Sequence, residues 1–247
     1  VEAARKHTDK RLIAAGAGNP PVVVDETANI ERAARDIVRG ASFDNNIICV
    51  DEKVAIVVNS VADELLSEMQ YHQAVLLTRQ QIEQLQSLLL TDIDEQGRGR
   101  PHRDWVGRDA AKIAAAIGLN VSEHTRLLLA ETDANHPFAV TEMMMPVLPI
   151  VRVRDVEEAI ELAIHLEGGR RHTAAMHSTN INNLHKMANA INTSIFVKNG
   201  PCIAGLGLGG EGCTSMTIST PTGEGVTSAR TFVRIRRCVM VDMFRIV

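Results

Sequence analysis

The chain has few aromatic residues, no long apolar run and no excess of basic charge. Aromatic residues make up 3% of its 247 residues, so the core must be built mainly from aliphatic side chains and methionine. No apolar stretch approaches the roughly 20 residues that a membrane-spanning helix needs. The net charge of -4 lacks the basic excess that binding to phosphates requires. We therefore expect a cytoplasmic protein that binds neither membranes nor nucleic acid.

The cysteine and histidine patterns argue against a structural metal site. The four cysteines lie far apart with no C-x-x-C pair, which disfavours a zinc knuckle or a small disulfide scaffold. The nine histidines are scattered, and no H-x-x-x-H pair falls on a predicted helix. We predict free thiols and no metal. The cysteines are Cys49, Cys202, Cys213 and Cys238.

Strand-like and helix-like patterns alternate along most of the chain. Short runs rich in β-branched residues predict strands at 11–15, 22–24, 53–58, 126–130, 147–153, 173–177 and 194–197. Apolar spacing of three and four predicts helices at 1–8, 30–38, 61–72, 79–90, 104–117, 156–166 and 181–191. This alternation predicts an α/β fold with a mostly parallel open sheet and flanking helices. Pro149 within its predicted strand indicates an edge strand or a bulge.

The last part of the chain has a different composition. Residues 205–210 match G-x-G-x-x-G by letter, but a β-prone segment follows them instead of a helix, so we interpret them as a flexible loop that could line a site. Residues 231–241 alternate arginines with apolar residues, which predicts a long half-exposed strand. Such a strand at the end of a chain often adds to a neighbouring sheet.

Cys49 is the most favourable candidate for a reactive side chain. It lies between a predicted helix, which Gly40 is expected to end, and the buried strand 53–58. Connections held by rigid elements often carry reactive groups. Free cysteine is also frequently buried and inert, so this pattern alone leaves both interpretations open. On composition alone Glu142 is expected to be a surface carboxylate. His172, which follows two arginines at the start of a strand, has only a weak indication of a site role.

Four segments together resemble the aldehyde dehydrogenase superfamily, and within it the CoA-acylating branch of ethanolamine utilisation. These segments are residues 15–21, 43–49, 142–149 and 196–237, and the resemblance extends along the whole chain. It implies that Cys49 is the nucleophile and that Glu142 holds the nicotinamide-side ribose of NAD. It also implies that Ala15 and Gly16 adjoin the bound cofactor.

Ala15 marks a departure from the hydrolytic members of that superfamily. Those enzymes carry a glutamate followed by Leu-Gly-Gly-Lys-Ser-Pro, and the glutamate activates the hydrolytic water. Ala15 stands at the position of the glutamate, and Asn19 at that of the lysine. Loss of a general base costs typically ~10²–10⁴-fold in rate. The thiol of CoA ionises more readily than water, so the resemblance implies an acyl-CoA product.

The resemblance also implies how the chain is organised. Residues 1–14 are expected to end a cofactor-binding domain, 15–225 to form the catalytic domain and 226–247 to form an oligomerisation strand. The chain starts at Val1 inside a predicted helix, so we expect a fragment or a processed portion of a longer protein, with little activity alone. The implied setting is a homo-oligomer in a bacterial microcompartment, with possible shell or enzyme partners.

Two other functions stay open. The first is a propionaldehyde dehydrogenase of propanediol utilisation, because one methylene group is worth only ~1–3 kcal/mol of discrimination. The second is a non-catalytic oligomerisation or scaffold fragment, whose terminal strand pairs with partner subunits. The expected reaction of the enzyme is acetaldehyde, CoA and NAD to acetyl-CoA and NADH.

Overall fold

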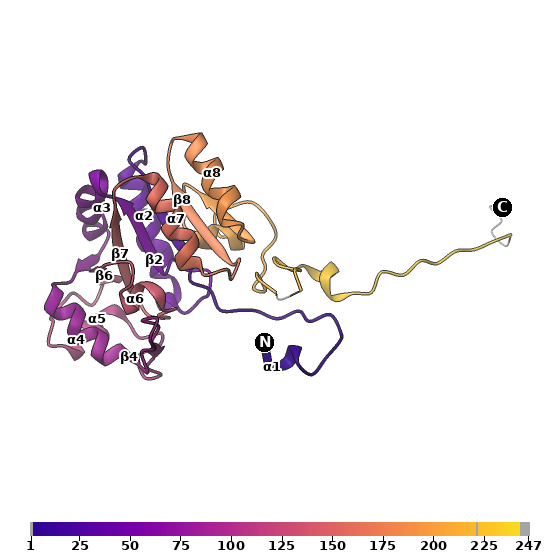
Figure 1. The fold of residues 1–247 in the computed structure, drawn as a ribbon, viewed down its shortest axis with the longest axis horizontal. Helices are drawn as coiled ribbons and strands as arrows, with labels where there is room; N and C mark the ends of the chain where they lie inside the picture. The colour runs from indigo at the N-terminus through magenta and orange to yellow at the C-terminus, as the bar shows by residue number, and fades with distance from the viewer. Residues whose placement is uncertain (1, 221, 243–247) are drawn as a thin grey trace.

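The centre of the molecule is a seven-stranded sheet (Figure 1). The computed structural model describes residues 2–220 and 222–242. All neighbouring strands of this sheet are parallel, in the order β3-β6-β7-β2-β1-β8-β9, which confirms the predicted α/β fold. The strands are β1 (Pro21–Val24), β2 (Val54–Val58), β3 (Ala74–Leu76), β6 (Leu127–Glu131), β7 (Val147–Val153), β8 (Thr173–His177) and β9 (Ile195–Lys198).

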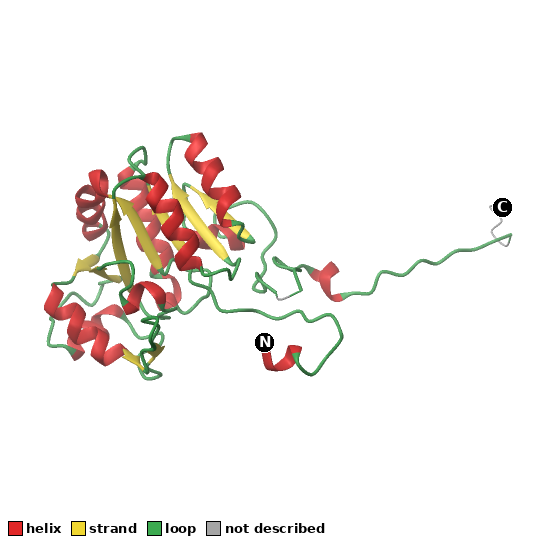
Figure 2. Cartoon of the chain, in the orientation of Figure 1, coloured by secondary structure: helices red, strands yellow, loops and turns green. Residues whose placement is uncertain are grey.

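Helices cover both faces of the sheet (Figure 2). Side chains of each strand alternate between the faces: Val22 and Val24 pack with the first pair of helices, and Val23 packs with the second pair. The first pair is α2 (Ile30–Ala41) and α3 (Asn59–Tyr71), and the second is α7 (Val156–Glu167) and α8 (Ile181–Ile191). A third cluster joins the β6–β7 region to α4 (Arg79–Leu89), α5 (Ala110–Ala116) and α6 (Pro137–Val140).

The remaining elements are short. They are α1 (Glu2–Arg5), an antiparallel pair of β4 (Leu90–Thr91) with β5 (Arg100–Pro101), and the 3₁₀ turns η1 (Phe43–Asn46), η2 (Cys202–Leu206) and η3 (Ala229–Phe232). Among the described residues, no helix combines the length and apolarity needed to cross a membrane. Two predicted helices are longer than the observed ones. Of the predicted helix 1–8 only α1 is helical among the described residues, and of 104–117 only α5 is helical.

Of the two predictions for Pro149, an edge strand or a bulge, the edge strand is wrong. Strand β7 lies between β6 and β2, and Pro149 is in register with Ala130 of β6. Proline removes only one donor from the ladder, and the bonds on either side remain available. The N–H of Thr132, for example, donates to the carbonyl of Ile150 at 3.0 Å. Pairing with both neighbouring strands therefore outweighs the local preference of proline.

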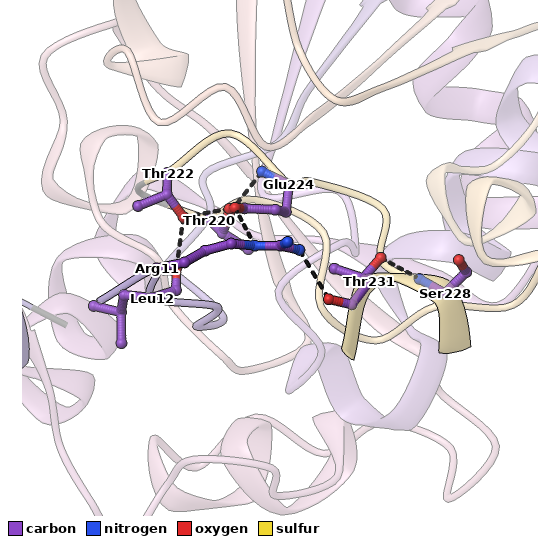
Figure 3. A network of polar contacts seen from close by, with 7 residues as sticks. All are labelled: Arg11, Leu12, Thr220, Thr222, Glu224, Ser228 and Thr231. Carbon is purple, nitrogen blue, oxygen red and sulfur yellow. Dashed lines mark hydrogen bonds and ion pairs between the residues drawn. The ribbon is translucent and has the colours of Figure 1, made fainter. Parts of the chain in front are cut away.

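Residues 11–15 do not form the predicted strand, because polar contacts hold this segment to the chain near residue 225. The Arg11 guanidinium pairs with the Glu224 carboxylate at 2.6 Å and donates to the carbonyl of Thr231 at 2.8 Å (Figure 3). The segment runs outside the sheet in Figure 1. The segment is thus an extended loop held by side-chain contacts instead of a strand.

The predicted strand 231–241 is not formed in this chain by itself. Beyond η3, residues 233–242 extend away from the body and have no strand partner in the described structure (Figure 1). A strand needs an adjacent ladder, and none lies beside this segment. Its apolar side chains are exposed, 61% for Val233 and 89% for Ile235. Pairing with a neighbouring subunit stays a prediction, and residues 243–247 lie outside the described residues.

Gly40 does not end the helix as predicted. Helix α2 continues to Ala41, with Ser42 as the C-cap residue. A Cβ atom at Gly40 would lie 2.2 Å from Oε2 of Glu52. This glycine therefore serves a tertiary contact, the close approach of a buried carboxylate to the helix.

Candidate active site

Four loops meet at the amino-terminal edge of the central strands. Gly18 precedes β1, Cys49 precedes β2, Glu142 precedes β7 and His172 directly precedes β8. Because these strands are parallel neighbours, the loops that lead into them lie together. Open α/β sheets usually bind ligands beyond the carboxyl ends of the strands. The candidate residues here gather at the opposite edge.

Gly18 is the contact point of these loops. Its backbone N–H donates to Oε1 of Glu142 at 3.2 Å. A Cβ atom at this position would lie 2.6 Å from the carbonyl oxygen of Cys49 and 3.1 Å from Cγ of His172. Only glycine allows so close an approach. The structure therefore brings Cys49, Glu142 and His172 together around one residue.

Cys49 follows a turn with an unusual backbone. Asp44, Asn45 and Asn46 have φ values of 44°, 53° and 63°, three consecutive residues in the left-handed region. Asparagine and aspartate tolerate this region better than other non-glycine residues. The N–H of Asp51 then donates to the carbonyl of Ile48 at 3.1 Å. This turn leaves the Cys49 thiol partly accessible between two packed elements.

The buried side chain of Lys53 ties this turn together. Lys53 is 1% exposed, and its Nζ donates to the carbonyl and Oδ1 of Asn46 at 2.7 and 2.8 Å and to the carbonyl of Ile48 at 3.0 Å. These three acceptors match the three donors of an ammonium group. Nδ2 of Asn46 donates in turn to the carbonyls of Ala41 and Glu52. The start and the end of the turn are thereby joined.

The surroundings of Cys49 shift the pKa of its thiol in opposite directions. Burial raises the pKa of the Cys49 thiol, and the nearby Glu142 carboxylate raises it further, whereas the Lys53 ammonium lowers it. Burial also raises the pKa of Glu142, against the Gly18 N–H and Lys53, which favour its ionised form. The resting thiol is therefore protonated at neutral pH and becomes a stronger nucleophile when a proton leaves.

His172 is a neutral imidazole at physiological pH. Burial lowers its pKa to about 4, and the charges of Lys53 and Arg170 act in the same direction. Its Nδ1 lies 2.9 Å from the hydroxyl of Thr173, and its backbone N–H donates to Oε1 of Glu167 at 2.9 Å. The ring is thus fixed against Gly18 without a charge of its own.

Two buried carboxyl groups lie behind the turn. Burial raises the pKa of Glu52 to about 7 and that of Asp51 to about 8. Oε1 of Glu52 accepts a hydrogen bond from the backbone N–H of Cys202 at 2.7 Å, and the thiol of this cysteine is also buried. Cys213 and Cys238 are exposed, so Cys49 differs from the other three thiols in being partly accessible among ionisable groups.

The structure places the predicted cofactor residues Ala15 and Gly16 beside a separate hollow. Gly16 lines a cavity of about 640 Å³, whereas Ala15 is exposed just before it. The other residues of the cavity wall are Ala17, Gly169, Arg170, Arg171, Asn192, Thr193, Ser194, Ser219, Thr220, Gly223 and Gly225. In the described part of the chain, no three histidine, cysteine or acidic side chains lie where they could hold a metal ion.

Sequence reasoning missed the supporting residues of the site. Gly18 lies in segment 15–21, which carries the family resemblance, but its role was not indicated by the sequence. The sequence also did not indicate that Asn46 and Lys53 form hydrogen bonds with each other. One signal was present: three charged residues, Asp51 to Lys53, directly precede a strand whose five residues are all buried. Charges so placed must find partners inside the protein.

Comparison with known proteins defines the class. A sequence model of the aldehyde dehydrogenase family matches residues 1–98 and 108–224. The chain therefore belongs to the aldehyde dehydrogenase family. It is 76% identical over 247 residues to acetaldehyde dehydrogenase (acetylating) EutE of Salmonella typhimurium, of which it covers 53%. The chain thus spans about half the length of the curated relatives that it matches.

Solved structures of aldehyde dehydrogenases also superpose closely on this chain. Propionaldehyde dehydrogenase of Rhodopseudomonas palustris, solved with bound CoA and an acylated cysteine, superposes with a TM-score of 0.90 at 51% identity, over 96% of this chain and 53% of that one. A propionaldehyde dehydrogenase from the fucose utilisation bacterial microcompartment of Clostridium phytofermentans gives a TM-score of 0.89 at 44% identity, over 96% of this chain and 54% of that one.

Proposed function

We propose that this chain forms the catalytic part of a CoA-acylating aldehyde dehydrogenase. The overall reaction converts an aldehyde, CoA and NAD⁺ to acyl-CoA, NADH and a proton. The observation that carries the proposal is the contact of the Cys49 turn with Gly18, whose N–H holds the Glu142 carboxylate. Similarity to an acetylating acetaldehyde dehydrogenase and to a structure with an acylated cysteine supports it.

Cys49 is the nucleophile in this proposal. Its thiolate attacks the carbonyl carbon of the aldehyde, and the oxygen takes up negative charge as the new carbon–sulfur bond forms. Backbone N–H groups near Cys49 stabilise that oxygen. After oxidation, Cys49 carries the acyl group as a thioester, which divides a difficult reaction into two easier steps.

The residues present fit a bound nicotinamide cofactor. Glu142 has one oxygen held by Gly18, and its other oxygen accepts no hydrogen bond within the described residues, so it can accept one from a ribose hydroxyl. Gly16, in the wall of the neighbouring cavity, lets the backbone come close to a ligand. When bound, NAD supplies the hydride acceptor for the oxidation.

The second half of the reaction transfers the acyl group to CoA. Ala15 provides no carboxylate to activate water, so hydrolysis of the thioester is slow. The thiol of CoA, a substrate, loses the proton that the overall reaction releases and attacks the thioester carbonyl as a thiolate, and the carbon–sulfur bond to Cys49 breaks. The thiolate of Cys49 is thereby regenerated and acyl-CoA is released. The same steps run in reverse for the reduction of acyl-CoA.

Acetaldehyde is the proposed substrate, with propionaldehyde as the alternative. The 76% identity to an acetaldehyde enzyme exceeds the 51% identity to a propionaldehyde enzyme. Competition between the two aldehydes, measured as kcat/KM, distinguishes them. We further propose that residues 1–14 end a cofactor-binding domain and that residues 15–225 form the catalytic domain. Residues 226–247 are proposed to pair with a neighbouring subunit, in a homo-oligomer within a bacterial microcompartment.

Replacement of Cys49 tests the proposed function. In the full-length protein, Cys49→Ser should abolish the aldehyde-dependent formation of NADH, because an alcohol is a far weaker nucleophile than a thiolate. Cys213→Ser, which changes an exposed thiol, is the matched control and should keep full activity. Retention of activity by Cys49→Ser would contradict the proposal.

A further inference from the structure

We propose that Lys53 is a positioning residue for Cys49, whose buried ammonium fixes the turn that presents the thiol and favours the thiolate. This inference rests on the proposed role of Cys49 as the nucleophile. It assigns a function to an ammonium group that is costly to bury.

All three hydrogen bonds of Lys53 are directed to the turn. They end on the carbonyl and side chain of Asn46 and on the carbonyl of Ile48, the residue just before Cys49. Among the described residues, no carboxylate lies within 4.0 Å of Nζ as a salt-bridge partner. The ammonium is thus satisfied by neutral acceptors. Burial lowers the pKa of Lys53, and the charges of Asp51 and Glu142 oppose that shift and favour the ammonium form.

The turn itself needs such support. The left-handed backbone of Asp44, Asn45 and Asn46 is less favourable than a right-handed one, although asparagine and aspartate tolerate it better than other non-glycine residues. Backbone of this kind persists only when its surroundings determine it. Lys53 and the side chain of Asn46 hold this backbone through buried hydrogen bonds. The side chain of Asn45 adds hydrogen bonds to Gly107 and Asp109 on the more exposed side of the turn.

Lys53 differs from the acidic groups around Cys49 because its charge favours the thiolate. Glu142 and Asp51 disfavour the thiolate, and Lys53 opposes them. His172, on the other side of Gly18, is neutral at physiological pH because its pKa lies at about 4. Burial raises the pKa of the Cys202 thiol, and Glu52, which lies behind the turn, raises it further. Arg170 acts on Glu142 and His172, whereas Lys53 acts on the Cys49 thiol itself. Loss of Lys53 therefore removes the cation that opposes these carboxylates at Cys49.

Alkylation of Cys49 in the full-length protein tests this role directly. The rate of modification by iodoacetamide is measured against pH, with peptide mass spectrometry to follow Cys49 alone. For Lys53→Met we expect the rate at neutral pH to fall about tenfold, and the pH profile to move to higher pH, as when an opposite charge beside a thiol is removed. Lys112→Met, at an exposed lysine, is the control and should match the wild type. An unchanged rate and profile in Lys53→Met would overturn the inference.

A second variant distinguishes the effect of Lys53 on the shape of the turn from the effect of its charge. It also tests the inference if the Lys53→Met protein does not fold. Asn46→Gly keeps the left-handed backbone accessible but removes one acceptor of Lys53 and two donor contacts. We expect slower alkylation with a pH profile close to that of the wild type, because the ammonium remains. A wild-type rate would overturn the positioning role. Activity retained by Cys49→Ser would instead contradict the proposed function, and the alkylation rates would still report on Lys53.

Discussion

The backbone N–H of Gly18 donates to Oε1 of Glu142 at 3.2 Å, across 124 residues of sequence. This bond joins the loop before β1 to the loop before β7, on either side of the Cys49 turn that precedes β2. The order of strands thus explains why residues so distant in sequence share one site.

Replacement of Gly18 should disrupt the site. A Cβ atom there would lie 2.6 Å from the carbonyl oxygen of Cys49, and backbone cannot move aside as a flexible side chain can. We expect Gly18→Ala to lower the free energy of unfolding by about 1–3 kcal/mol and to reduce turnover. Chemical denaturation and steady-state kinetics measure the two effects. Gly16→Ala is the control for stability, because its Cβ would meet Ser219 at an ordinary 3.7 Å.

Gly40→Ala should be destabilising although it lies within a helix. Alanine normally stabilises a helix interior by about 0.5–1 kcal/mol relative to glycine. At this position the new methyl group would lie 2.2 Å from Oε2 of Glu52, so we expect a net loss of stability instead. In the double variant Gly40→Ala with Glu52→Ala the clash disappears, and its loss should be smaller than the sum of the single losses. Additive losses would show that the two residues do not conflict.

Stability should fall as the pH rises from about 6.5 to about 8. The pKa values of Glu52 and Asp51 are raised to about 7 and about 8, so the folded protein retains protons that the unfolded chain has lost. Proton release then favours unfolding. Below pH 6.5, His172 and His177, whose pKa values lie at about 4, act in the opposite direction.

Glu52→Gln isolates one of these groups. We expect its unfolding free energy to decline less steeply over this pH range, because the amide cannot ionise. Glu83→Gln, at an exposed helical position, should leave the slope unchanged. Equal slopes in Glu52→Gln and the wild type would show that Glu52 is already ionised at neutral pH.

Introduction of a carboxylate at Ala15 should change the product. We expect Ala15→Glu to raise the release of free carboxylic acid relative to acyl-CoA, because the resemblance to hydrolytic aldehyde dehydrogenases implies that a glutamate at this position activates water. Chromatographic separation of the two products measures the ratio. Ala115→Glu, at an exposed position of α5, is the control and should leave the ratio unchanged. An unchanged ratio in Ala15→Glu would contradict the interpretation of Ala15.

Local patterns were sufficient for the main elements of the fold. The periodicities that predicted α2, α7 and α8 are those of amphipathic helices, and the structure confirms them. Strand β3 was missed because three residues give too little pattern to recognise. The position of Pro149 could not be predicted, because strand order is a tertiary property that a single strand does not encode.

The site was only partly accessible to sequence reasoning. Resemblance to a family indicated Cys49 and Glu142, but the contact through Gly18 depends on the packing of three loops. The partners of Lys53 lie five and seven residues away, yet their geometry depends on a left-handed turn that composition does not specify. Residues 231–241 show the opposite limit, since a strand-like pattern forms no strand without a neighbouring ladder.

Detection of the acyl-enzyme tests the central claim most directly. The full-length protein is incubated with acetyl-CoA in the absence of NADH, quenched in acid and digested for peptide mass spectrometry. The account predicts one acetyl group on the peptide that contains Cys49, lost again on addition of free CoA. Acetylation confined to Cys202, Cys213 or Cys238, or no acetylation at Cys49, would contradict it.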